Sequence, residues 1–387
     1  MSRNRNRNKR KTIYIFAGAL SCIGCFMMMA FPAVTLNAAQ KGIVLWASSV
    51  LPALLPFFIC ANFMTALGLP AYIGRIFEKP FQKLFGAPGI SAFIFSVSIT
   101  SGYPIGAKLI GDFGRSGEIT RSDARRMLTF CSTSGPLFML GAVGAGMLAS
   151  SAAGAVIALS HYLGALLNGL LFRIIPSEDP GPYRATPVRS ASGKGSLLEI
   201  FTDSMITSFR ALGIICGYIV LFMMITDFIR LSGVLDFLRN DWVRSFLNGL
   251  LEMTVGCSGI AESVSPDLPG KCILCAFLVS FGGISVYAQS MSMLSGLKIG
   301  SLYYLAAKIS HGLLAAAIAG LIGPLLLASD TLAVWAFPKE DIVTGLGIFY
   351  QLLFSTKMVI MVVFLFLITI LTDRLIRKIR EKREKRA

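Results

Sequence analysis

The sequence predicts an all-α, polytopic helical membrane protein, and three observations lead to this fold class. Of the 387 residues, 55% are apolar and only 14% are charged, whereas a soluble chain carries about 25% charged residues. The apolar residues form runs of about 20 residues or more, enough for a helix to cross a ~30 Å hydrocarbon core. These runs are continuous rather than alternating, which argues against a β-barrel. The composition excludes a soluble enzyme, a disordered chain and a secreted disulfide scaffold.

Ten apolar segments are predicted to enter the membrane: 13–36, 43–69, 88–111, 125–149, 151–175, 208–231, 246–264, 270–294, 303–328 and 344–372. Two of them, 88–111 and 270–294, carry polar residues in mid-run and are predicted to re-enter rather than cross. About eight full crossings then remain. The interpretation of 246–264 stays open, because Glu252 and Glu262 are costly within a membrane.

The distribution of charge orients the chain. The formal net charge is +16, and basic residues cluster before the first apolar segment and after the last one. Nucleic-acid binding is one interpretation of such arms. Each arm adjoins an apolar segment, however, so the positive-inside rule explains them better and places both termini in the cytoplasm, next to membrane lipids. We therefore expect no nucleic-acid partner.

A stretch rich in Pro, Gly and Ser, 176–196, is predicted to be a cytoplasmic linker. It separates two predicted repeats, 42–175 and 197–328. Residues 101–108 align with 282–289 at an offset of 181, and 132–135 with 309–312 at an offset of 177. Outside the repeats, 1–41 and 329–387 are each predicted to hold one transmembrane helix and a basic tail.

The mid-run breaks are predicted to form the functional site. Gly102 and Pro104 interrupt a helix in the first repeat, and Gly282 and Gly283 mark the break in the second. Interrupted backbone at membrane depth is tolerated only where it is buried in protein or lines a wet cavity. Many transporters build their binding sites from such half-helices.

Neutral polar side chains near the breaks can hydrogen-bond a small solute without the cost of a buried charge. Lys308 and His311 lie three residues apart on one helix face. Alternatives stay open: Lys108 can snorkel to headgroups, His311 can be a core histidine, and Ser or Thr can serve packing only. The candidate substrate-binding residues are Ser101, Gly102, Tyr103, Pro104, Lys108, Ser132, Thr133, Ser134, Gly282, Gly283, Tyr287, Gln289, Lys308 and His311.

Catalytic and metal-binding motifs are not found in the sequence. The chain has two histidines and no phosphate-binding loop, HExxH or GxSxG pattern. Two CxxC pairs, Cys22–Cys25 and Cys272–Cys275, lie in apolar runs without a nearby histidine or acid, where cysteine behaves as a small hydrophobic residue. We expect no enzymatic activity, no cofactor and no metal.

Two stretches, SGYPIGAK at 101–108 and FCSTSGP at 130–136, resemble the YlbJ family of sporulation integral membrane proteins. The likeness extends over about 43–328. That family carries the nucleoside-recognition gate domain, which it shares with spore maturation membrane proteins, concentrative nucleoside transporters and ferrous-iron transporter gates. The resemblance implies two gate-like repeats, an endospore-forming bacterium, a role in spore formation and a location in the inner membrane. The second half departs from the motif, because Gly282-Gly283-Ile284-Ser285 lacks the proline.

Two functional hypotheses follow. In the first, the breaks form a gate or transport site for a small solute, nucleoside-like or an ion. In the second, the chain is a non-transporting membrane scaffold for assembly of the spore envelope, and exchanging the 176–196 linker should abolish its function. A homo-oligomer and spore-envelope partners stay open in both.

Overall fold

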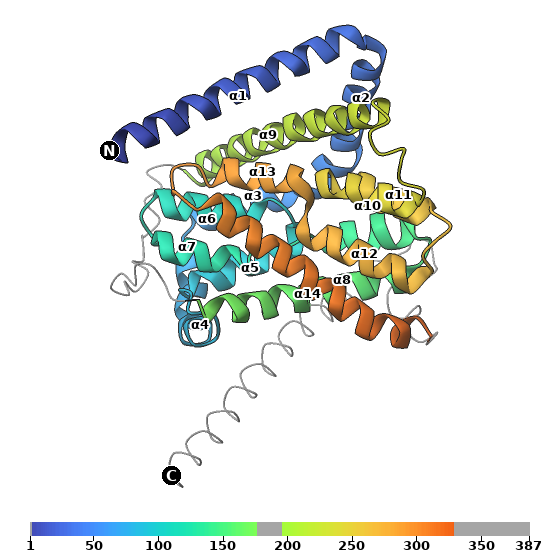
Figure 1. Ribbon diagram of the computed structural model, residues 1–387. Helices are drawn as coiled ribbons and strands as arrows, with labels where there is room; N and C mark the ends of the chain where they lie inside the picture. The colour runs from blue at the N-terminus through green and yellow to red at the C-terminus, as the bar shows by residue number, and fades with distance from the viewer. Residues whose placement is uncertain (1, 176–195, 329–387) are drawn as a thin grey trace.

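The computed structural model describes residues 2–175 and 196–328, and within them the chain is helical with no β-strand. The all-α prediction is confirmed. Figure 1 shows the elements, which are α1 (Ser2–Ala30), α2 (Pro32–Leu45), η1 (Trp46–Val50), α3 (Leu51–Ala66), α4 (Leu69–Phe85), α5 (Ile90–Ser101), α6 (Ile105–Arg115), α7 (Arg121–Leu128), η2 (Leu137–Met147), α8 (Ser151–Arg173), α9 (Leu197–Leu231), α10 (Asp241–Leu251), α11 (Met253–Glu262), α12 (Leu268–Phe281), α13 (Gly283–Met293) and α14 (Ser301–Leu327).

Several helices are long and apolar enough to cross a membrane. In the described part of the chain four spans meet this test: Ser151–Arg173, Leu197–Leu231, Leu268–Met293 and Ser301–Leu327. The number rises to six if each of two sharply bent pairs, α1 with α2–η1 and α3 with α4, is one span. A multi-pass membrane protein is therefore confirmed. The predicted eight crossings stay a prediction, because segment 344–372 and most of the 176–196 linker lie outside the described residues.

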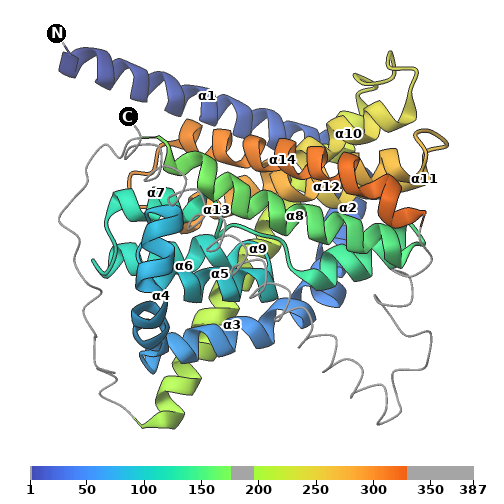
Figure 2. The ribbon, with the colours of Figure 1, turned by 90° about the horizontal axis from the view of Figure 1, so that it is seen from below.

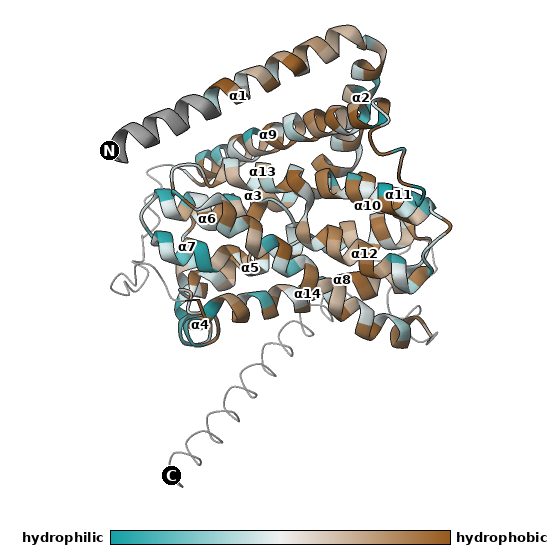
Figure 3. Cartoon of the chain, viewed as in Figure 1, coloured by the Kyte–Doolittle hydropathy of each residue, from teal (hydrophilic) through white to brown (hydrophobic). Residues whose placement is uncertain are grey.

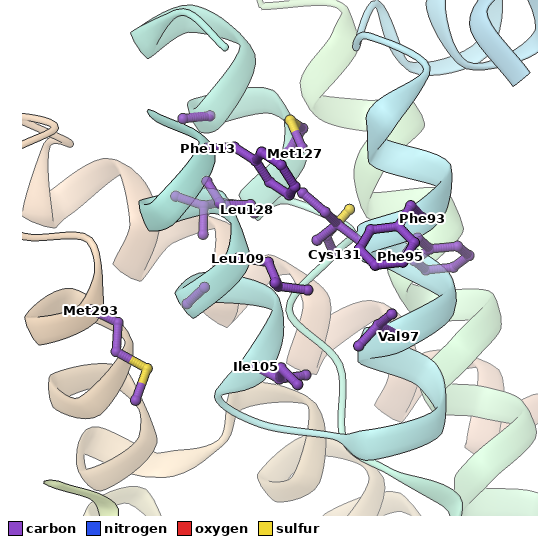
Figure 4. Close-up of a cluster of buried hydrophobic side chains, with 14 of the residues drawn as sticks. Phe93, Phe95, Val97, Ile105, Leu109, Phe113, Met127, Leu128, Cys131 and Met293 are labelled. Carbon is purple, nitrogen blue, oxygen red and sulfur yellow. The ribbon is translucent and has the colours of Figure 1, made fainter. Parts of the chain in front are cut away.

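Helices α5 and α6 form a hairpin. Gly102, with φ of 87°, ends α5, and the chain then reverses (Figure 4). A Cβ added to Gly106 would lie 2.9 Å from the Ser98 hydroxyl oxygen, a contact that one straight helix would not allow over eight residues, about 12 Å of rise. The reversal agrees with the re-entry predicted for 88–111.

A second hairpin joins α10 and α11 at Glu252. A Cβ on Gly249 would lie 3.0 Å from the Gly256 Cα, so the two arms pack face to face through glycine. Glu252 caps α11 by accepting the backbone N–H of Val255 at 2.8 Å. The segment 246–264, left open by the sequence, therefore folds back on itself.

Two sequence predictions are corrected. Segment 270–294 does not re-enter: α12 and α13 continue as one span, Leu268–Met293, interrupted at Gly282. Gly282 has ψ of −5° and α13 begins at the next residue, whereas Gly102 has an extended ψ of −169° and α6 begins only at Ile105. Segment 125–149 is not one helix, since 129–135 is non-helical between α7 and η2. The breaks at 101–108 and 282–289, aligned from the sequence, thus differ in geometry.

The core has an aromatic part and a small-residue part. Near α4 and α5, the rings of Phe85 and Phe130 stack with centroids 4.3 Å apart. Helices α8, α12 and α14 pack side by side, as Figure 2 shows for α8 and α14, and a Cβ on Gly164 would lie 3.1 Å from the Ala315 nitrogen. Small residues allow this close approach between helices in lipid.

One end of the bundle is basic. Arg126 donates to the Arg173 and Ile175 carbonyls at 3.2 Å each, and Arg115 donates to the Met293 carbonyl at 2.8 Å. The Arg125 guanidinium lies 4.2 Å from the centroid of the Tyr303 ring. These contacts join the ends of α6, α7, α8 and α13 and the start of α14. Figure 3 shows hydrophilic residues gathered there, around α4, α6 and α7.

Candidate functional site

Two backbone interruptions meet inside the bundle. The tip of the α5–α6 hairpin packs against the non-helical segment 129–135, and a Cβ on Gly102 would lie 2.5 Å from the Gly135 nitrogen. Tyr103, at the same tip, reaches the other interruption: its ring lies 3.8 Å from a Cβ built on Gly282. The tip therefore touches interrupted elements from both halves of the chain.

Lys308 lies at the centre of this junction. It projects from α14, is only 2% exposed, and donates from Nζ to the Tyr103 hydroxyl at 2.6 Å and to the Ser132 carbonyl at 3.3 Å. Nζ also lies 4.3 Å from the centroid of the Tyr103 ring, a cation–π distance. Within the described residues, the partners of this buried ammonium are all neutral.

Tyr103 links Lys308 to α12 through hydrogen bonds. Its hydroxyl lies 3.2 Å from the Val279 carbonyl oxygen and 3.1 Å from that of Ser280. These carbonyls belong to the last turn of α12, where an ending helix leaves acceptors unpaired and carries partial negative charge. The interruption at Gly282 thus places a helix C-terminus within the protein interior.

His161, on α8, joins the segment 129–135 to α12. The Ser134 backbone N–H donates to Nε2 at 2.8 Å, and Nδ1 lies 2.7 Å from the Ser280 hydroxyl. Because Nε2 accepts a hydrogen bond, it carries no proton, and Nδ1 must be the donor to Ser280. The hydrogen bonds thus assign one neutral tautomer.

His311 completes this layer from α14, one turn after Lys308. Its Nε2 donates to the His161 carbonyl at 2.9 Å, and the two imidazole rings lie 4.7 Å apart, centroid to centroid. Both histidines therefore have structural hydrogen bonds within the described residues.

A second branch of the network runs through tyrosines. The Ser132 hydroxyl lies 2.8 Å from the Tyr304 hydroxyl, and Tyr304 stacks on Tyr287 with centroids 5.4 Å apart. The Thr133 hydroxyl lies 2.9 Å from that of Ser98 on α5. Ser132, Thr133 and Ser134 are thus each hydrogen-bonded to a different helix.

Comparison with known proteins supports one family. The chain is 28% identical over 349 residues to the "Sporulation integral membrane protein YlbJ" of Bacillus subtilis (strain 168), covering 83% of this chain and 84% of that protein. The resemblance to the YlbJ-type family is confirmed. No family model and no solved structure matches the chain.

Most of the predicted site residues come together. Ser101, Gly102, Tyr103 and Pro104 form the hairpin tip, and the remaining members of the junction are Ser132, Thr133, Ser134, Gly282, Tyr287, Lys308 and His311. Whether they bind a solute stays a prediction.

Three predicted residues lie apart from the junction. Lys108 donates to Asn62 Oδ1 and Asp112 Oδ2 at 2.8 Å each, linking α6 to α3. Gln289 donates to the Ser285 hydroxyl at 3.1 Å within α13. A Cβ on Gly283 would lie 3.0 Å from the Leu251 carbonyl oxygen, so this glycine packs against the α10–α11 tip.

The sequence prediction missed His161, Ser280 and Tyr304. His161 and Tyr304 lie within apolar helices, without a break beside them, whereas Ser280 lies two residues before the break at Gly282. One signal was available: the chain has two histidines, and a buried imidazole in a membrane helix is costly unless it is hydrogen-bonded. Pairing the two histidines would have placed α8 beside α14.

The junction can bind and orient a polar ligand. The hydroxyl oxygens of Ser101, at the hairpin tip, and Ser160, beside His161, are buried and have no hydrogen-bond partner in the structure, so a solute or water can satisfy them. Within the described ranges no group of three His, Cys, Asp or Glu side chains is arranged to hold a metal ion.

Proposed function

We propose that this protein moves or gates a small solute, nucleoside-like or an ion, across the inner membrane of a bacterium during spore formation. The observation that carries the proposal is the buried polar junction of two helix interruptions, which joins the halves of an otherwise apolar bundle. The similarity to a sporulation integral membrane protein supports the biological context.

The contacts of the junction favour binding over catalysis. His161 and Ser280 resemble a base and a nucleophile, 2.7 Å apart. Nδ1 of His161 already carries the proton, however, because Nε2 accepts the Ser134 N–H. An imidazole in this tautomer cannot take the Ser280 proton through Nδ1. We therefore propose that the chain is not an enzyme.

The basic end supports an orientation. Arg115, Arg125, Arg126 and Arg173 gather at the end formed by α6, α7 and α8, and the positive-inside rule favours the cytoplasm for such an end. The α5–α6 hairpin then enters from the cytoplasm, and both chain termini are cytoplasmic in this proposal. Membrane lipids and a small solute are the proposed partners.

Cysteine accessibility tests the proposal. In a full-length variant with all eight native cysteines replaced, Ser101→Cys places a thiol at the hairpin tip. We expect a membrane-impermeant maleimide to label it through a water-filled path from at least one side of the membrane, in intact cells or inverted vesicles.

Ala107→Cys is the matched control, because Ala107 lies on the same hairpin, buried by packing at 1% exposure. It should stay unlabelled. If Ser101→Cys is also unlabelled from both sides, no solute path reaches the junction, and the scaffold hypothesis replaces this proposal.

A further inference from the structure

We infer that Lys308 is a proton-binding residue whose protonation sets the direction of the Tyr103 hydrogen bond and thereby ties the α5–α6 hairpin to α12. The inference deepens the proposed function and rests on it, since it names the proton as a ligand of the same junction.

The titratable groups that face Lys308 are Tyr103 from the hairpin tip, His161 from α8 and His311 from its own helix. Tyr162 and Tyr304 lie near Tyr103. Within the described part of the chain no carboxylate is among the contacts of Lys308. The helix interruption supplies the opposing charge instead, because carbonyl oxygens at the end of α12 bear partial negative charge.

The hydrogen bonds of Tyr103 have one direction while Lys308 is protonated. An ammonium has donors and no acceptor, so protonated Lys308 must donate to the Tyr103 oxygen, 2.6 Å away. The Tyr103 O–H is then free to donate to the Val279 or Ser280 carbonyl. The chain of bonds runs from α14 through the hairpin tip to α12.

The hydrogen bonds of His161 leave it no site for a further proton. His161 offers no free acceptor, because Nε2 takes the Ser134 N–H and Nδ1 donates to Ser280. A second proton would break the bond to Ser134 and leave a buried N–H unpaired. His311 donates from Nε2 to the His161 carbonyl, which holds it in place between α8 and α14.

Loss of one proton from Lys308 reverses the hydrogen bond to Tyr103. When Lys308 gives one proton to water in the path, Nζ becomes an amine with a lone pair. That lone pair accepts the Tyr103 O–H, so the hydroxyl turns away from Val279 and Ser280. The C-terminal carbonyls of α12 lose their donor, and the hairpin tip is released from the interruption at Gly282.

Labelling kinetics test the switch. In the cysteine-free Ser101→Cys protein, maleimide labelling is measured from about pH 5 to about pH 9 with Lys308 intact, with Lys308→Met and with Tyr103→Phe. Every variant carries the same thiol, so ratios of rates between variants cancel its own titration. The labelling rate with Lys308 intact, divided by the labelling rate of the Lys308→Met variant, should change about tenfold across the range. A change of this size is expected for gain or loss of a charge-assisted hydrogen bond.

The ratio between Lys308→Met and Tyr103→Phe should stay constant with pH, because either change removes the switch. Lys108→Met is the matched control: it removes another buried lysine, one with a carboxylate partner, and should retain the pH dependence. If labelling occurs but the ratio of labelling rates between the protein with Lys308 intact and the Lys308→Met variant stays constant with pH, the proton inference is overturned. The proposed function then still stands. Absence of labelling in every variant overturns both.

Discussion

Two buried lysines illustrate how partners decide the role of a charge. Lys108 has the carboxylate of Asp112 and the amide oxygen of Asn62 at 2.8 Å, so its charge is paired. Within the described residues, the hydrogen-bond acceptors of Lys308 are a hydroxyl oxygen and a carbonyl oxygen. Burying an unpaired ammonium is expensive, and proteins retain such groups in membrane segments mainly for function. Residue type alone does not separate these lysines; their contacts do.

At the residue scale, His161→Ala should lower the free energy of unfolding by about 1–3 kcal/mol. The substitution leaves the buried Ser134 N–H without its acceptor, which is the costly kind of hydrogen-bond loss. Thermal unfolding of the purified protein in detergent, followed by tryptophan fluorescence, measures the effect.

Tyr162→Phe is the control for that measurement. It removes a neighbouring hydroxyl whose bonds to the Ile99 and Ser134 carbonyls are longer, 3.2 Å each, and it should cost about 1 kcal/mol or less. If the two variants lowered the free energy of unfolding equally, the hydrogen bond from Ser134 to His161 would contribute no more than an ordinary one.

At the element scale, glycines allow close backbone contact at both hairpins. A Cβ on Gly106 would collide with the Cys131 carbonyl oxygen, so segment 129–135 packs directly against α6. A Cβ on Gly249 would meet Gly256 in the other arm of the α10–α11 hairpin. Backbones approach each other in this way in membranes where small residues face one another.

Gly106→Ala should therefore prevent segment 129–135 from packing against α6, and should lower the free energy of unfolding by about 3 kcal/mol or more, comparable to severe overpacking. Gly141→Ala is the control, since its nearest neighbour would be the flexible end of Leu137 at 3.6 Å. Yield of monodisperse protein and the unfolding midpoint report the difference. A Gly106→Ala protein as stable as Gly141→Ala would refute the close contact.

The element scale also shows why sequence prediction succeeded in part. The hairpin at 88–111 was predictable because Gly102 and Pro104 interrupt an apolar run. Segment 125–149 was predicted as a crossing because its apolar residues outnumber Ser132, Thr133 and Ser134. The hydroxyls of Ser132 and Thr133 and the backbone N–H of Ser134 instead bond to other helices, and the backbone there is not helical. The decisive partners are distant in sequence, so no local pattern encodes them.

At the scale of the whole molecule, one order of elements occurs twice. A hairpin, an interrupted segment and a continuous helix follow one another as α5–α6, α7–η2 and α8, and again as α10–α11, α12–α13 and α14. Ser301, which begins α14, lies 150 residues after Ser151, which begins α8. This order favours a duplication with an offset near 150 residues rather than the offset near 180 inferred from short sequence matches. The repeat itself stays a prediction.

The orientation of the whole bundle gives the last prediction. Single cysteines at Ser116, Arg189 and Val264 in the cysteine-free protein sample the loop after α6, the 176–196 linker and the loop before α12. Ser116 lies at the basic end with Arg115, whereas Val264 is fully exposed and precedes α12, whose start lies beside the end of α14 at the opposite end.

Because the positive-inside rule assigns the basic end to the cytoplasm, an impermeant maleimide added to intact cells should label Val264→Cys and spare the other two. Permeabilised cells should label all three, which controls for reactivity. Labelling of Ser116→Cys in intact cells, with Arg189→Cys protected, would mean that the α5–α6 hairpin enters from outside. The basic cluster would then lie on the wrong side of the membrane for this orientation.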